Sequence, residues 1–141
     1  MEPLKWPEFY KPAQQKSFLG AFTRLQKENW DRVKHSVYKQ LLSRPRPDLD
    51  QWGHDDCRHK VGQTLCNLVK QMYGWPNNHF IPEDPIDVVF LMPHDDLEIV
   101  EVILEFEDVF NVLPPNIHDK LEKCKLLGEL TEILAIESGC P

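Results

Sequence analysis

Residues 94–110 read His94-Asp95-Asp96-Leu97-Glu98-Ile99-Val100-Glu101-Val102-Ile103-Leu104-Glu105-Phe106-Glu107-Asp108-Val109-Phe110. At the period of an α-helix this stretch separates into two lines of residues. Apolar residues recur at steps that place them on one face, and acidic residues recur at three- and four-residue steps on another face. The apolar line is Val102, Ile103, Phe106 and Phe110, and the acidic line is Glu98, Glu101, Glu105 and Asp108. The stretch is therefore predicted to be an acidic amphipathic helix with one buried face.

The charge of the chain is divided unequally between its two halves. Residues 1–76 carry 13 Lys and Arg against 8 Asp and Glu, whereas residues 77–141 carry 3 against 15, and the net charge is −7. This division indicates either a surface that binds a basic protein partner or packing of the basic N-terminal extension on the acidic second half. We do not expect a nucleic-acid partner, because the chain as a whole is acidic and no recognised motif accompanies its basic residues.

The sequence predicts neither a membrane protein nor an exported one. No apolar run approaches the roughly 20 residues that a membrane helix needs, and the N-terminus lacks the basic region and apolar core of a signal peptide. The chain is expected to be cytoplasmic. Its four cysteines could form two disulfides, but their spacing does not mark a secreted framework. Cys66 and Cys124 are interpreted as buried or half-buried thiols.

The first part of the chain is predicted to be an aromatic arm followed by helix. Residues 1–12 contain Trp6, Phe9 and Tyr10, which would be costly to leave bare, so we expect the arm to lie on the body of the protein. Residues 13–43 form one long helix or two, because Asn29 or Asp31 could cap a second one. The prolines that follow predict a linker over residues 44–54.

The second part is predicted to be helical as well, so the fold class is all-α. Asp55 or Asp56 can cap a helix that runs to about Tyr73, where Gly74 stops it. Residues 77–94 are expected to form a long loop or one short helical turn that buries Phe90 and Leu91. A last helix is expected near 126–136, and its inward-facing residues are Leu127, Leu130, Ile133 and Leu134.

Three blocks of this second part carry a resemblance. They are Asp95-Asp96-Leu97-Glu98-Ile99-Val100-Glu101-Val102, then Phe106-Glu107-Asp108-Val109-Phe110 through Pro115, then Glu122-Lys123-Cys124-Lys125-Leu126-Leu127-Gly128-Glu129-Leu130. They are similar to Asp-Ser-Leu-x-x-Val-Glu-Leu, Leu-Glu-Glu-x-Phe with a following Ile-Pro, and Glu-Lys-Ile-x-Thr-Val-Gly-Asp-Leu. In this order the blocks resemble the acyl carrier protein family over about residues 56–137. The resemblance implies an acyl-carrier-like four-helix bundle over residues 55–141, preceded by an aromatic arm and basic helical extension over residues 1–54.

One departure from the family pattern concerns its defining chemistry. The family carries 4′-phosphopantetheine on the serine that follows the first Asp, and here Asp96 occupies that position. A carboxylate cannot hold the group in a stable phosphodiester, so no phosphopantetheine and no other cofactor is expected. Asp96 either caps the helix or supplies the negative charge that the phosphodiester would place there.

In the family the matching helix docks on basic patches of partner enzymes, so the resemblance implies a partner-binding surface on the acidic helix. Leu97 and Leu104 would supply apolar contacts inside an acidic rim. A plainly solvated face is the alternative. The residues predicted to bind the partner are Asp95, Asp96, Leu97, Glu98, Val100, Glu101, Leu104, Glu107 and Asp108.

No catalytic set or metal site is predicted. The metal-capable groups His54, Asp55, Asp56, Cys57 and His59 match no structural zinc pattern and are interpreted as solvated residues around a helix start. The cysteines lack a partner arrangement for nucleophilic catalysis, and no phosphate-binding loop occurs. The sequence therefore predicts a non-enzymatic interaction module. The alternatives are a genuine acyl or peptidyl carrier with atypical attachment, or a small regulatory or immunity-type protein.

Overall fold

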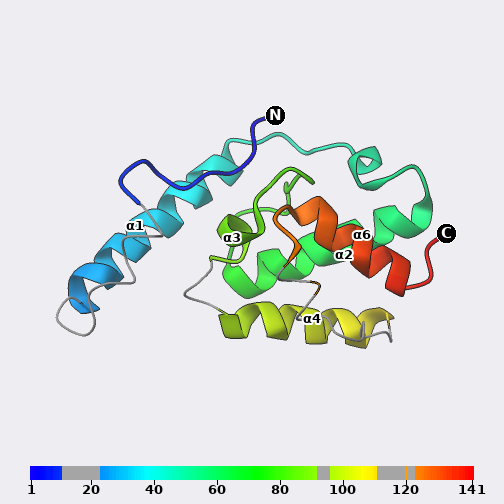
Figure 1. The fold of residues 1–141 in the computed structure, drawn as a ribbon. Coiled ribbons are helices and arrows are strands. Elements are labelled where there is room, and N and C mark those ends of the chain that lie inside the picture. The colour runs from blue at the N-terminus through cyan, green and yellow to red at the C-terminus, as the bar shows by residue number, and fades with distance from the viewer. Residues whose placement is uncertain (11–22, 92–95, 111–119, 121–122) are drawn as a thin grey trace.

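The structure, a computed structural model, describes residues 1–10, 23–91, 96–110, 120 and 123–141, without the side chains of 23–28, 96–100, 103 and 110. Within this part of the chain there are five α-helical segments and one 3-10 turn, and no strand (Figure 1). The prediction of an all-α protein is therefore confirmed.

The central element is α2, Asp56–Tyr73, which begins and ends at local sequence signals. The Asp55 side chain accepts a hydrogen bond of 2.8 Å from the Arg58 backbone N–H and so caps the helix start. Gly74 ends the helix in the left-handed conformation, with φ of 69°, which glycine adopts at little cost. The predicted boundaries of this helix are confirmed.

Helix α2 packs against both α4, Asp96–Phe110, and α6, Leu127–Glu137 (Figure 1). Apolar side chains from all three helices and from the loops between them meet in one buried cluster. Burying each large side chain of this kind contributes roughly 1.5–3 kcal/mol. The most completely buried members are Val61, Leu65, Val69, Phe80, Val89, Phe90, Val102, Phe106, Leu127, Leu130 and Leu134. Ile133, predicted to face inward on α6, is only partly buried.

Before α2 the chain forms one continuous helix, α1, over Thr23–Leu42. A second helix capped at Asn29 or Asp31 is therefore not formed, and residues 13–22 lie outside the described part of the chain. Val33, Val37 and Leu41 are fully buried and hold one face of α1 against the rest of the protein.

The N-terminal arm lies on α1, as predicted, although not with all its aromatic rings covered. Tyr10 is buried, and Trp6 is partly buried. Their ring centroids lie 5.9 Å and 6.2 Å from that of Trp30. Phe9 remains 51% exposed and contacts the Arg32 guanidinium, 4.6 Å from its ring centroid. An aromatic ring can stay exposed where a cation covers its face.

Residues 44–54, predicted to be a linker, contain buried side chains and a 3-10 turn, η2, over Leu49–Trp52. Arg44 and Trp52 are each 8% exposed. Trp52 lies in the same buried cluster as Leu4 and Leu41 and the core of α2. The segment is therefore packed on the body, and the division of the chain into two domains stays a prediction.

A buried ion pair joins the N-terminal segment to the loop before α3, Ile86–Val89. Arg44 donates two hydrogen bonds of 2.7 Å to the two carboxylate oxygens of Asp84. Asp84 also accepts the backbone N–H of Leu4 at 2.8 Å and that of Ile81 at 2.9 Å. The loop thus acts as a packing surface for the arm and the end of α1. Phe90 and Leu91, which follow α3, are buried as predicted, and of the two alternatives, a loop or one short helical turn, the turn is the one that forms.

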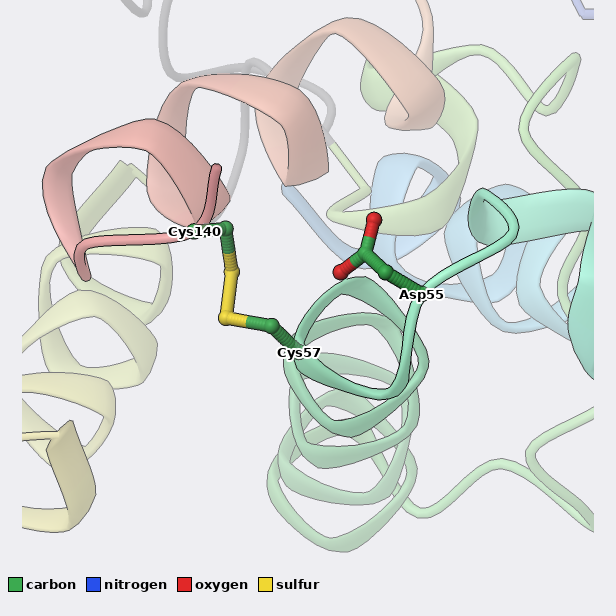
Figure 2. A group of neighbouring side chains, drawn as sticks. All are labelled: Asp55, Cys57 and Cys140. Atoms are coloured by element: carbon green, nitrogen blue, oxygen red, sulfur yellow. A yellow bond between two sulfur atoms is a disulfide. The ribbon is translucent and has the colours of Figure 1, made fainter.

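A disulfide links Cys57, in the first turn of α2, to Cys140, which follows α6 (Figure 2). The two Cα atoms are 5.7 Å apart, within the range that a disulfide spans. The sequence did not predict this pairing. Cys66 is buried and Cys124 half-buried, and both are free thiols as predicted.

Candidate functional site

The outer face of α4 carries a stripe of exposed residues, Glu101, Leu104, Glu105 and Asp108. Their spacing of three, four and seven residues places them on one side of the helix. Val102 and Phe106, on the other side, are buried against the core with exposures of 0% and 1%. The predicted separation of an apolar face from an acidic face is therefore present in the described part of α4.

Apolar atoms interrupt the acidic stripe. Leu104 is 48% exposed, as predicted. Val109 is 54% exposed as well, but it lies five residues further on and therefore about 140° around the helix, on the opposite flank of the stripe. Glu107 is partly buried on the flank of the stripe. We name the surface formed by these two apolar residues and by Glu101, Glu105, Glu107 and Asp108 the acidic face of α4. Within it Leu104 lies between Glu107 on one side and Asp108 and Glu101 on the other, and an apolar residue among charged ones is a common composition of protein interfaces.

The charges of this face do not stabilise the helix that carries them. Glu101 and Glu105 are like charges four residues apart, which destabilises an isolated helix by about 0.2–0.5 kcal/mol. Glu107 and Asp108 lie in the last turn, where the helix dipole disfavours negative charge. Helix α4 contains neither Lys nor Arg, and none of the ion pairs among the described residues uses these carboxylates.

Five of the predicted partner-binding residues cannot be assigned to this face. Asp95 lies outside the described residues, as do the side chains of 96–100. Asp96 is the first residue of α4, but its side-chain contacts are not described. The two interpretations of Asp96, a helix cap and a charge mimic, therefore both stay predictions.

The basic N-terminal segment packs on the loop that precedes α3 and leaves the acidic face of α4 exposed. Its contacts there include the pair of Arg44 with Asp84 and a hydrogen bond of 2.9 Å from Asn77 Nδ2 to the Leu41 carbonyl. Within the described part of the chain, α4 packs mainly against α2. Intramolecular packing of the extension thus occurs at residues 77–84.

A second polar cluster surrounds the first turn of α2. The Arg58 guanidinium donates to Asp55 at 2.9 Å, to both Glu132 oxygens at 3.0 and 2.8 Å, and to the Pro141 carbonyl at 2.6 Å. Hydrogen bonds from the Arg58 backbone N–H and guanidinium lower the pKa of Asp55, and the guanidinium lowers the pKa of Glu132. The Arg58 cation thus joins α2 to α6 and to the segment after it.

This cluster contains residues that the sequence analysis missed. The sulfur atoms of Cys57 and Cys140 and a carboxylate oxygen of Asp55 lie within 4.8 Å of one another. Asp55 and Cys57 were noted as metal-capable, but Cys140 is 83 residues away from Cys57 and no local pattern joins them. His59, considered with them, instead contacts the Gly53 carbonyl at 2.6 Å and Asp50 at 3.3 Å.

No protein-family profile, curated protein or solved structure matches this chain. The acyl-carrier resemblance rests on the three sequence blocks described above. Among the described helices, none has both the length and the apolar character that crossing a bilayer requires.

Proposed function

We propose that this chain is a non-enzymatic, acyl-carrier-like interaction module that binds a basic protein partner through the acidic face of α4. The observation that carries the proposal is the exposure of Leu104 among carboxylates of α4 that form no ion pair with any described residue. An exposed leucine and unpaired carboxylates add no stability to the fold. A partner that buries Leu104 and places cations beside the carboxylates would gain binding free energy from both the apolar and the charged contacts.

The order of helices supports the carrier-like part of the proposal. Helices α2, α4 and α6 occur at the positions that the resemblance implies, and α4 and α6 both pack on α2. In this arrangement α4 takes the place of the helix that carriers present to their enzymes. Asp96 stands at its first turn in place of the attachment serine.

The absence of carriage is tested by intact mass after co-expression with a broad-specificity phosphopantetheinyl transferase. The expected mass is that of the unmodified chain, because a carboxylate cannot keep the group. An Asp96→Ser variant tests the carrier-like surface, because it restores the attachment chemistry and is expected to gain the group. A modified wild-type chain would support the alternative of genuine carriage with atypical attachment.

Binding through the acidic face is tested with the same transferase as a defined partner, since the resemblance implies that it recognises this helix. The double reversal Glu101→Lys with Asp108→Lys is expected to weaken binding at least tenfold, which corresponds to about 1.4 kcal/mol. Binding by the wild type is expected to fall with added salt. Both positions are exposed, so the variant is expected to stay folded.

The matched control is Glu83→Lys with Asp87→Lys, which reverses two exposed charges outside α4. It is expected to leave the dissociation constant unchanged. Equal weakening by the control and the double variant would show that net charge, and not the acidic face of α4, decides the binding. Undetectable binding of the wild type would contradict the carrier-like part of the proposal.

We place the module in the cytoplasm as part of the same proposal. A reducing compartment would hold the pair of Cys57 and Cys140 as thiols for much of the time. What the two reduced cysteines can bind does not depend on partner binding by α4.

A further inference from the structure

Three potential metal ligands converge where α2 begins. The carboxylate of Asp55 points toward the sulfur atoms of Cys57 and Cys140 (Figure 2), and one ligand atom from each residue lies within 4.8 Å of the other two. Asp55 and Cys57 are half-buried and Cys140 is 9% exposed. The group is thus reachable from solvent but not surrounded by it.

In the disulfide form the two sulfur atoms are bonded to each other and are poor ligands. Two external thiols can reduce the disulfide by thiol–disulfide exchange. Their two electrons break the S–S bond, their two protons go to the sulfurs of Cys57 and Cys140, and they leave as a disulfide of their own. The product is a pair of thiols that remain close to Asp55, because α2 and α6 also pack on each other through residues other than Cys140.

A tetrahedral zinc ion requires only small movements of these atoms. Bond lengths of about 2.3 Å to sulfur and about 2.1 Å to oxygen place neighbouring ligand atoms roughly 3.5–3.8 Å apart. Sulfur atoms released from a bond of about 2 Å must separate by roughly 1.8 Å. Cys140 lies outside α6, and its backbone N–H donates to the Ala135 carbonyl at 2.9 Å. Rotation of the two cysteine side chains about χ1 can supply the movement without breaking this hydrogen bond.

The charges around the group match a divalent cation. Two thiolates and the Asp55 carboxylate together carry three negative charges. The Arg58 guanidinium, 2.9 Å from Asp55, divides its one positive charge between Asp55 and Glu132, so the group retains the negative charge that attracts a divalent cation. The Arg58 hydrogen bonds also fix the orientation of the Asp55 carboxylate, as groups behind a metal ligand commonly do. Cys57 lies in the first turn of α2, where the helix dipole stabilises negative charge.

We propose that the reduced chain binds one zinc ion through Cys57, Cys140 and Asp55, and that disulfide formation abolishes the site. Thiolate ligands select zinc over the hard cations Mg²⁺ and Ca²⁺. Three protein ligands leave the fourth position to water. Binding Zn²⁺ releases the two thiol protons to solvent, so the affinity rises with pH.

The test uses the full chain with Cys124→Ser, which removes the half-buried free thiol that could compete for metal. One sample is reduced with a phosphine, which does not chelate zinc strongly, and one is kept oxidised. Zinc is titrated into both against a chromogenic chelator. The expected result is one equivalent bound by the reduced chain and none by the oxidised chain. Equal binding by the two forms, or none by either, would overturn the proposal.

Ligand identity is tested with Co²⁺ in place of Zn²⁺, because the sulfur-to-cobalt charge-transfer absorption counts thiolates. Cys140→Ser should remove about half of this absorption, and Cys66→Ser should leave it unchanged. Asp55→Asn keeps an N-cap residue, so α2 should remain folded by circular dichroism while zinc affinity falls about tenfold or more. Asp56→Asn removes the same charge from an exposed neighbour. An equal loss in Asp56→Asn would exclude Asp55 as a ligand.

Discussion

Replacing Asp84 with alanine should destabilise this protein strongly, because the carboxylate has four hydrogen-bond donors and no contact with solvent. It is 0% exposed. Two of the donors belong to the Arg44 guanidinium, which is itself 8% exposed, and two are the backbone N–H groups of Leu4 and Ile81. Removing the carboxylate leaves a buried cation and two buried amide groups without these partners.

The expected loss is about 3–5 kcal/mol, the range for breaking one side of a buried ion pair. The orphaned amides add to the loss only in part, because the loop can relax and water can enter. A protein of this size has a total stability of about 5–15 kcal/mol, so the variant should remain folded but with a melting temperature lower by roughly 10–20 °C. Arg44 also donates to the carbonyls of His79 at 3.1 Å and Glu2 at 2.7 Å, which partly compensate its charge.

The assay is urea unfolding followed by far-ultraviolet circular dichroism, with a double-mutant cycle. Adding Arg44→Met to Asp84→Ala removes the uncompensated cation, so the double variant should be no less stable than Asp84→Ala alone. Glu83→Ala, at the exposed neighbouring position, should change stability by less than about 0.5 kcal/mol. A loss below about 1 kcal/mol for Asp84→Ala, or strictly additive losses in the cycle, would refute the reasoning.

Three further perturbations test other contacts. Gly62→Ala places a Cβ atom 2.5 Å from Cγ of the buried Trp52 ring and should cost about 1–3 kcal/mol in urea unfolding; an unchanged midpoint would contradict the packing of η2 on α2. The Arg58 hydrogen bond lowers the pKa of Glu132 below its usual 4.5, so its stabilising effect is present above pH 4.5 and is lost as the pH falls through the lowered pKa. The melting temperatures of wild type and Glu132→Gln should therefore converge below pH 4.5, and a constant difference would exclude this linkage. Burial raises the pKa of the Cys66 thiol, so it should react with a maleimide only after unfolding; labelling of the native protein at the rate of a free thiol would contradict its burial.

The parts of the fold that could be predicted from the sequence are those that local signals determine. Asp55 and Gly74 mark the ends of α2 because capping and the left-handed conformation depend on single residues at fixed positions. The burial of Val102 and Phe106 followed from helical periodicity. The exposure of Glu101, Glu105 and Asp108 followed from the same periodicity, whereas that of Leu104 was expected from the resemblance to the docking helix of carrier proteins.

The contacts that the sequence could not reveal join distant segments. Arg44 meets Asp84 across 40 residues, and Cys57 meets Cys140 across 83. Each of these residues is unremarkable among its own neighbours, since a buried ion pair or a disulfide depends on packing that brings two segments together. The sequence left open whether residues 13–43 form one helix or two for a related reason: Asp31 is a possible cap, but it is exposed and can remain in a helix interior when the buried stripe continues past it.

The two faces of α4 differ in what they contribute to the free energy of unfolding. Val102 and Phe106 on the inner face contribute roughly 1.5–3 kcal/mol each. The like charges and the acids of the last turn cost only about 0.2–1 kcal/mol each. The fold therefore tolerates the acidic outer face without requiring it. Replacing Glu101 and Asp108 with lysine should then raise the stability of the chain slightly, because it removes the unfavourable charges of the helix. The same change should weaken partner binding, because it removes charges that attract the basic partner. A residue set whose removal improves the fold and damages an interaction owes its presence to that interaction.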